Sequence, residues 1–265
     1  MLESASYTHI YASGPGKLHG CMIAYSIDLF EELAHAVAFY DDLSIWEGAA
    51  DRKGLTRLTK NIGLIVGLKR RGSSTGFIIA TTHLFWHPRQ SLLLLREIKR
   101  FREQHNLTDW PCIIAGDFNF PPTDPAYSLL VGENLTQDQW KKLDESRVVH
   151  VSVDSSLNES NISVKIPEDE NADPDIMITH SRSACADDAL LSNEGVLSLF
   201  QRLLPLRSAY EEGQRILRDD SSSNTFGSRF DDTFPLQRIG YYEPMWTSYT
   251  HHWKSTLGEV IKQHI

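Results

Sequence analysis

The sequence is poor in the features that mark membrane and secreted chains. No apolar run approaches the ~18 residues of a membrane-spanning helix, and the first residues have neither the basic start nor the apolar centre of a signal peptide. The three cysteines, Cys21, Cys112 and Cys185, are few, odd in number and scattered. We therefore expect no membrane partner, no disulfide scaffold and a reducing, intracellular location in the cytoplasm or nucleus.

Positive charge is also in short supply. The chain has 26 Lys and Arg residues against 35 Asp and Glu residues, a formal net charge of −9. A protein that holds nucleic acid through a broad basic face should be positive, which argues against that mode of binding. Any polyphosphate substrate must therefore be held locally, with help from a divalent metal.

No internal repeat interrupts the chain, and nothing in it indicates a second domain. Its 265 residues are 41% hydrophobic and 23% charged, as in ordinary globular proteins. This length is enough for one large α/β domain with a substantial core, which we place at residues 1–265.

The most informative stretch is CIIAGDFNFPP at residues 112–122. Its apolar run predicts a buried strand, and the two prolines stop the strand soon after Asp117 and Asn119. Side chains alternate along an extended chain, so Asp117 and Asn119 should point to the same side. A carboxylate beside a carboxamide suits a metal ion, a water or a phosphate oxygen. The alternative is a polar turn that merely closes the strand.

A second strand, in GFIIATTHLFWHP at residues 76–88, ends in His83. Residues 91–104 between the two strands predict a helix, because Leu94, Leu95, Ile98 and Phe101 recur at helical spacing. The pattern is a strand–helix–strand unit with polar residues at corresponding strand ends, where open α/β sheets place their sites.

These residues resemble a known family. An apolar strand ending in GDFN, preceded by a strand ending in THL, resembles the endonuclease/exonuclease/phosphatase superfamily, which has the deoxyribonuclease I fold. TTHLFWHP is similar to its branch of deadenylases, nocturnin-like and Angel-like proteins and fungal RNA exonucleases, as are LRSAY at 206–210 and SYTHHWKSTL at 248–257. The resemblance implies a four-layer α-β-β-α sandwich over nearly the whole chain.

The resemblance also implies roles for three residues. Asp117 would orient or activate the attacking water, or share in binding Mg²⁺. Asn119 would donate its amide to the scissile phosphate, and His83 would hydrogen-bond a phosphate oxygen. A carboxylate, an amide and an imidazole that converge on one phosphate form a chemically sensible set.

Three further residues are candidate substrate contacts by the same resemblance. Lys17 precedes a Gly-Cys strand, Asn61 opens the apolar run NIGLIVGL, and Arg89 is the one arginine in a short approach to the helix. Alternatively, Lys17 is a solvated turn residue and Asn61 caps its strand. For His19 the same two interpretations stand as for Lys17: a substrate contact or a solvated turn residue.

Other family positions are not matched. The family opens with two strands that end in an asparagine and in the glutamate that is its principal Mg²⁺ ligand, and both would precede residue 1. Gly258 stands where the family has an aspartate, and the family's Ser-Asp-His segment would follow Ile265. We therefore expect a sandwich that is incomplete at both ends and holds Mg²⁺ weakly.

Elsewhere the sequence predicts further elements. These are a strand edge with a short helical piece at 28–46, helical structure at 123–145, a polar surface excursion at 171–188 and a short helix at 197–204.

The sequence thus predicts a Mg²⁺-dependent phosphodiesterase, with Mn²⁺ as an alternative metal. It would cleave RNA, or another phosphodiester, as a 3′-5′ exonuclease or deadenylase through metal-assisted attack of water. One alternative is a catalytically inactive or truncated relative that acts as a binding module. Another is an incomplete gene product of an ordinary nuclease.

Overall fold

The computed structural model of the chain describes residues 6–45, 54–157, 178 and 180–213. The chain divides into two compact units, one of Met1–Ile166 and Pro174–Leu206 and the other of Pro167–Asp173 and Arg207–Ile265. Every helix and strand below belongs to the first unit. The prediction of a single domain over residues 1–265 stays a prediction, because most of the second unit lies outside the described residues.

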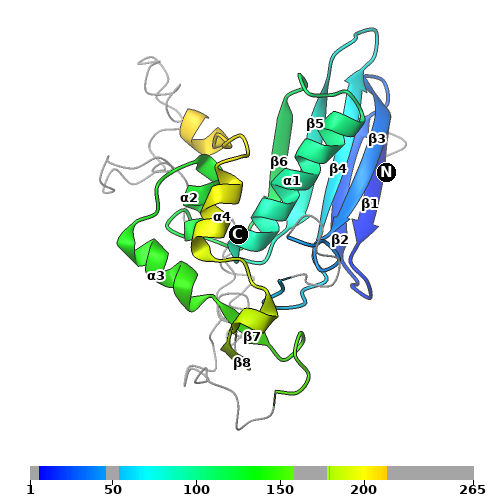
Figure 1. Ribbon diagram of the computed structural model, residues 1–265. Helices are drawn as coiled ribbons and strands as arrows, with labels where there is room; N and C mark the ends of the chain where they lie inside the picture. Colours follow the sequence, from blue (N-terminus) through cyan, green and yellow to red (C-terminus); the bar gives the residue numbers. More distant parts are fainter. Residues whose placement is uncertain (1–5, 46–53, 158–177, 179, 214–265) are drawn as a thin grey trace, which may run out of the picture. The chain divides into compact units, whose positions relative to one another are not determined.

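A four-stranded sheet lies at the centre of the first unit (Figure 1). Its strands, in spatial order, are β3 (Phe30–Phe39), β4 (Ile62–Arg70), β5 (Gly76–His83) and β6 (Cys112–Asp117). The first three pair antiparallel, whereas β6 pairs parallel to β5. β4 is buried along nearly its whole length, as its continuous apolar run predicts for a strand covered on both faces.

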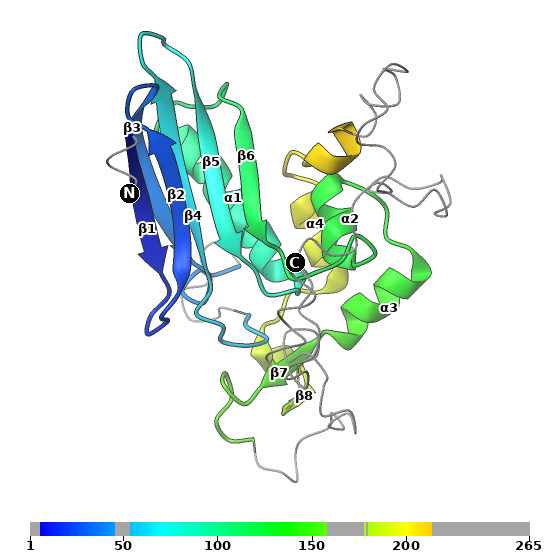
Figure 2. The same ribbon diagram turned by 180° about the vertical axis from the view of Figure 1, so that it is seen from behind.

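A hairpin of β1 (Tyr7–Ser13) and β2 (Gly20–Ser26) covers one face of this sheet (Figure 2). β2 packs over β4 and β5. The side chains of Cys21, Ile23, Leu64 and Val66 form a core between the two sheets. Alternation explains this arrangement, since the inward residues of β2 are buried and the outward ones are exposed.

The opposite face is covered by α1 (Pro88–Gln104) (Figure 1). The predicted core face is confirmed: Leu94, Ile98 and Phe101 pack with Ile65 and Ile78 of the sheet. The helix begins before residue 91, because Pro88 occupies the first turn and the His87 side chain accepts the N–H of Arg89.

Three further helices extend this helical layer. They are α2 (Pro125–Val131), α3 (Gln137–Glu145) and α4 (Asn193–Phe200), and α1, α2 and α4 share a second apolar cluster. The remaining strands, β7 (Val148–His150) and β8 (Ser181–Ser183), form a small antiparallel pair. None of the described helices is long and apolar enough to cross a membrane.

The α/β class is confirmed, and the described residues supply three layers: helices, the four-stranded sheet and the β1–β2 hairpin. Three local predictions need correction. The helical piece within residues 28–46 is wrong, because Phe30–Phe39 form the long strand β3, which stands at the edge of the sheet. The strand predicted at residues 112–115 forms as β6, but none of its residues is buried and Ile113 is 52% exposed, because β6 is the other edge strand. Residues 171–177 and 179 of the polar excursion lie outside the described residues, and the rest contains β8, in which Ser181 is fully buried and Arg182 pairs with Asp154 and Asp188. Residues 248–257 and Gly258 lie outside the described residues.

Candidate active site

The two strands that carry the sequence motifs end side by side. In the parallel pairing of β5 with β6, His83 stands directly opposite Asp117. The backbone N–H of Leu84 then donates to the Asp117 carbonyl at 2.8 Å, which extends the pairing one residue past His83. The strand–helix–strand unit therefore brings the two motifs to one edge of the sheet, as predicted.

Gly116 permits this close approach. Its φ is 155°, which side chains rarely adopt, and a Cβ atom at this position would overlap the carbonyl oxygen of Thr82. Thr82 itself is buried, and its hydroxyl donates to the Ile62 carbonyl at 3.0 Å and lies 2.8 Å from the Tyr40 hydroxyl. The ends of β5 and β6 are thus held next to Thr82, a buried residue whose hydroxyl is hydrogen-bonded.

A turn, rather than an extended chain, brings Asn119 to Asp117. β6 ends at Asp117, and Asn119 has a φ of 54°, in the left-handed region that asparagine tolerates. The Asn119 backbone N–H donates to Oδ1 of Asp117 at 3.1 Å. Side-chain alternation was therefore the wrong reason for placing the two residues together, although they do lie together.

Asn119 also holds His83. Its side-chain Nδ2 lies 2.9 Å from His83 Nε2 and donates to the Leu84 carbonyl at 2.9 Å. A carbonyl oxygen only accepts, which fixes the orientation of the amide, and so His83 Nε2 must also accept. The imidazole therefore carries its proton on Nδ1. Both amide hydrogens of Asn119 are used, so in this structure Asn119 positions His83 rather than offering a free donor to a phosphate.

Lys17 and Asn61 are bonded to each other. The Lys17 ammonium donates to Oδ1 of Asn61, which is buried at the start of β4. Asn61 Nδ2 donates to Oε1 of Gln90 at 3.4 Å, and the same oxygen accepts the Phe85 N–H at 2.7 Å. Because β4 runs antiparallel to β5, Asn61 stands at the same end of the sheet as His83.

His19 lies close to the site, although the sequence left open whether it contacts substrate or is a solvated turn residue. It is exposed just before β2, and its ring centroid lies 6.0 Å from that of His83. Cys21, two residues further on, is buried against the site. Burial raises the pKa of its thiol, opposed by a hydrogen bond with the His83 backbone and by the charge of Lys17. The packing of the β1–β2 hairpin on β5 brings His19 and Cys21 close to His83, and no local sequence motif predicts this proximity.

Arg89 does not join this group. It is 5% exposed, and its guanidinium donates to the carbonyls of Tyr40 at 3.1 Å and Leu43 at 2.7 Å. The structure gives Arg89 the role of tying the start of α1 to the chain after β3. The prediction that it contacts substrate has no support here, because the sequence showed an arginine near the motif and not the direction of its side chain.

The chemistry of the group suits an oxygen-seeking cation in one respect. Asp117 is exposed, and a Mg²⁺ ion commonly takes one or two carboxylates with waters and substrate phosphates completing its shell. Asp117 fits as one such ligand. The described residues nevertheless bring together no group of three or more His, Cys, Asp or Glu side chains that could hold a metal ion.

Comparisons with known proteins place these motifs in context. The model of the Endonuclease/Exonuclease/phosphatase family matches residues 2–155. A probable RNA exonuclease of Schizosaccharomyces pombe is 30% identical over 251 residues, which are 85% of this chain and 48% of that protein. A probable RNA exonuclease of Saccharomyces cerevisiae is 36% identical over 129 residues, 44% of this chain and 25% of that protein. The chain thus spans about half the length of these relatives, or less.

Among solved structures, ANGEL2, described as a 2′,3′-cyclic phosphatase, matches with a TM-score of 0.40 and 23% identity over 62% of this chain and 45% of that one. The human Nocturnin catalytic domain matches with a TM-score of 0.37 and 21% identity over 49% of each chain. The family match covers more than half of the 265 residues and includes both strand-end motifs. The chain therefore belongs to the endonuclease/exonuclease/phosphatase family, as its THL and GDFN motifs predicted.

Proposed function

We propose that this chain is a metal-dependent phosphodiesterase of RNA, of the 3′-5′ exonuclease or deadenylase type. The observation that carries this proposal is the pairing of His83 with Asp117 at adjacent strand ends, with Asn119 bonded to both. The names of the relatives, probable RNA exonucleases, support the choice of RNA as substrate.

Each residue of the group has a task that its geometry supports. Hydrolysis of a phosphodiester needs an oriented water and neutralisation of charge on the phosphate. The exposed Asp117 carboxylate orients the water and accepts its proton. His83, held at Nε2 by Asn119, presents its Nδ1 proton to a phosphate oxygen. Lys17, fixed by Asn61, adds positive charge near the Cys21 end of the site.

Mg²⁺, held in part by Asp117, would supply Lewis-acid polarisation of the phosphate when bound. The proposal does not require a preformed cage, because Mg²⁺ retains several waters and takes further ligands from substrate phosphates. Mn²⁺ suits the same oxygen ligands.

Cleavage of a 5′-labelled oligo(A) RNA tests the proposal. The purified 265-residue chain is incubated with Mg²⁺, with Mn²⁺ or with EDTA, beside Asp117→Asn and the matched exposed variant Asp28→Asn. We expect metal-dependent shortening from the 3′ end, which falls about 10²–10³-fold or more in Asp117→Asn and is unchanged in Asp28→Asn. Equal cleavage by Asp117→Asn and the unmodified chain would contradict the role of Asp117.

Binding without hydrolysis is the second candidate, and one observation favours it: the described residues lack a cluster of three metal-ligating side chains. A non-catalytic relative would still bind oligo(A), and turnover would be absent with either metal. Cleavage that depends on metal and on Asp117 would exclude this candidate.

A further inference from the structure

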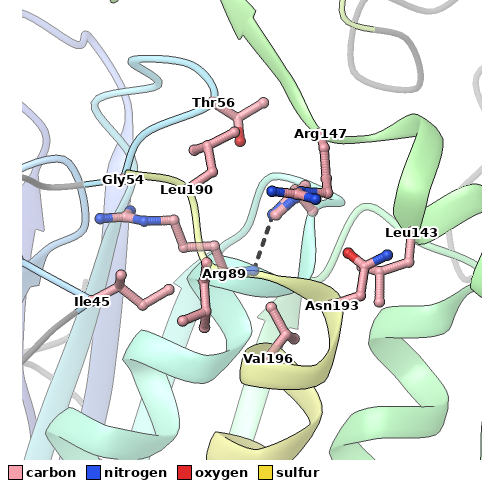
Figure 3. A pocket seen from close by; sticks show the side chains of 11 residues that line it. Ile45, Gly54, Thr56, Arg89, Leu143, Arg147, Leu190, Asn193 and Val196 are labelled. Atoms are coloured by element: carbon pink, nitrogen blue, oxygen red, sulfur yellow. Dashed lines mark hydrogen bonds between the residues drawn. The ribbon is translucent and has the colours of Figure 1, made fainter. Parts of the chain in front are cut away.

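A buried glutamine, Gln90, lies beside the candidate active site in the first turn of α1. The residue is 4% exposed. Arg89, just before it, lines a pocket between the starts of α1 and α4 together with Leu143 of α3 (Figure 3). Successive residues of an α-helix point about 100° apart, so the two side chains leave α1 in different directions. That of Gln90 reaches Asn61 and Phe85.

The Gln90 amide is hydrogen-bonded at both ends. Its Oε1 accepts the backbone N–H of Phe85 at 2.7 Å and Nδ2 of Asn61 at 3.4 Å. Its Nε2 donates to Oγ1 of Thr59 at 2.7 Å. Phe85 follows the end of β5, whereas Thr59 and Asn61 precede β4. One side chain therefore joins the start of α1 to both segments.

These bonds fix the orientation of two amides in succession. A backbone N–H only donates, so the oxygen of Gln90 must face Phe85. Asn61 then has to present its Nδ2 to that oxygen, which leaves its Oδ1 for the Lys17 ammonium. An Asn61 amide turned the other way would set two donors, its Nδ2 and the ammonium, against each other. We call Phe85, Gln90, Asn61 and Lys17 the amide relay.

Asp41 holds the other end of Gln90 through Thr59. Thr59 Oγ1 accepts Gln90 Nε2 and, at 3.1 Å, the Asn61 N–H, so its own proton goes to Asp41 Oδ1 at 3.3 Å. The same carboxylate accepts the backbone N–H groups of Thr59 at 2.8 Å and Lys60 at 2.6 Å. Both ends of the Gln90 amide are thus tied to hydrogen-bonded parts of the chain.

We propose that Gln90 is the positioning residue that aligns Lys17 with the chain after His83. This rests on the proposed function, in which Lys17 and His83 act on the substrate. One oxygen of Gln90 accepts both from Asn61, which holds Lys17, and from the N–H two residues after His83. Gln90 itself is buried, and it acts on the substrate only through the amide relay.

Three variants separate positioning from folding. Gln90→Met keeps the length of the side chain and removes its hydrogen bonds, whereas Gln90→Glu retains an oxygen that faces Phe85 and Asn61. Gln139→Met is the matched control, because Gln139 of α3 is also buried, at 2% exposed, and donates to Thr123 and Ser128 at 3.0 Å each. All three should lower the melting temperature, since each disturbs a buried polar group.

The first measurement uses no RNA. The full chain is acetylated with limiting acetic anhydride, and the modification of Lys17 is followed by mass spectrometry relative to the exposed Lys99. We expect Lys17 to react about threefold faster or more in Gln90→Met, because Asn61 no longer holds its amine. Neither Gln90→Glu nor Gln139→Met should speed the reaction.

Binding of labelled oligo(A) in EDTA is the second measurement. We expect Lys17→Gln and Gln90→Met each to raise the Kd about tenfold. The double variant should bind no more weakly than either single one, because Gln90 acts through Lys17. Gln139→Met should bind as the unmodified chain does.

Equal acetylation of Lys17 in Gln90→Met and the unmodified chain would overturn the positioning role. So would an equal acceleration in Gln139→Met, or a double variant whose Kd rises about 100-fold, as two independent effects would give. Cleavage is a separate outcome. If the two measurements agree with expectation and oligo(A) is not cleaved, the role of Gln90 is supported and the catalytic part of the proposed function fails.

Discussion

Single side chains set the geometry of the strand ends at the candidate active site. Gly116 lets β6 approach Thr82, and Asn119 turns back in the left-handed region to hold both Asp117 and His83. Each position depends on a backbone conformation that most residues adopt only at a cost. The candidate site is therefore more sensitive to these two positions than to its exposed surroundings.

Replacing Gly116 by alanine should lower the free energy of unfolding by about 2 kcal/mol or more, because backbone strain is added to overlap with the Thr82 carbonyl. Gly72→Ala is the matched control: its φ is also positive, at 72°, but no atom lies within 4 Å of the added Cβ. That variant should lose only about 1 kcal/mol. Urea unfolding measures both, and equal losses would show that contact with Thr82 is unimportant.

The sequence located the residues whose signal is local. His83, Asp117 and Asn119 each end or follow an apolar run, so their strand-end positions could be predicted from pattern alone. Contacts made by packing could not: the approach of His19 to His83 depends on how the β1–β2 hairpin lies over β5. The contacts of Arg89 were likewise unpredictable, since nothing in the sequence shows that its guanidinium turns toward the carbonyls of Tyr40 and Leu43.

Among the secondary-structure elements, the helices owe their starting points to side-chain caps. Asp124 caps α2 and accepts the Ala126 N–H at 3.0 Å. Burial raises its pKa from 3.8 to about 6, although the Ala126 hydrogen bond and the charge of Lys142 oppose this. Between about pH 4 and pH 6, the folded chain therefore holds a proton at this carboxyl that the unfolded chain releases.

This shift has a definite sign. A carboxyl whose pKa is raised by folding favours the folded state at low pH, and that contribution is lost as the pH rises from about 4 to about 6. Asp124→Asn keeps a good cap and removes the titration. Relative to the unmodified chain, it should gain about 1–3 kcal/mol between pH 4 and pH 7.

Urea unfolding of both proteins at the two pH values measures that gain. Asp138→Asn, in the exposed first turn of α3, is the matched control. A stability difference between Asp124→Asn and the unmodified chain that stays constant with pH would show that Asp124 does not titrate in this range.

Elements with a strong period could be predicted, and those defined by long-range partners could not. The spacing of apolar residues predicted α1 to be a helix, and the continuous apolar run predicted β4 to be a strand. The side-chain cap of α1 shifted only the residue at which the helix begins. β3 was missed as one strand because its acidic and apolar residues mix, and a bulge between Glu32 and Ala34 breaks the alternation. β8 is held by β7 and by the ion pairs of Arg182, which no pattern within residues 171–188 reveals.

For the chain in its entirety, the acidic balance limits how it could hold the RNA that we propose as its substrate. A net charge of −9 leaves only local groups such as Lys17 to meet phosphates. Single-stranded RNA loses affinity with salt by about 0.7 log units per tenfold salt for each phosphate neutralised. With about one to three such contacts, we expect a slope of log affinity against log salt of about −1 to −2.

Fluorescence anisotropy of labelled oligo(A) in EDTA, over a range of potassium acetate concentrations, measures this slope. Lys17→Gln should make it shallower by about 0.7, and Lys99→Gln, an exposed change on α1, should not. A slope near that of a broad basic face, about −4 or steeper, would contradict local binding.

The bond between Asn119 and His83 also has a kinetic consequence. It joins residues 36 apart in sequence, with α1 and β6 lying between His83 and Asn119 along the chain. Contacts of this kind close late in folding, because the intervening chain must be ordered first. We therefore expect a refolding chain to gain helix and hairpin before it gains the paired strand ends, so that the proposed active site is completed last.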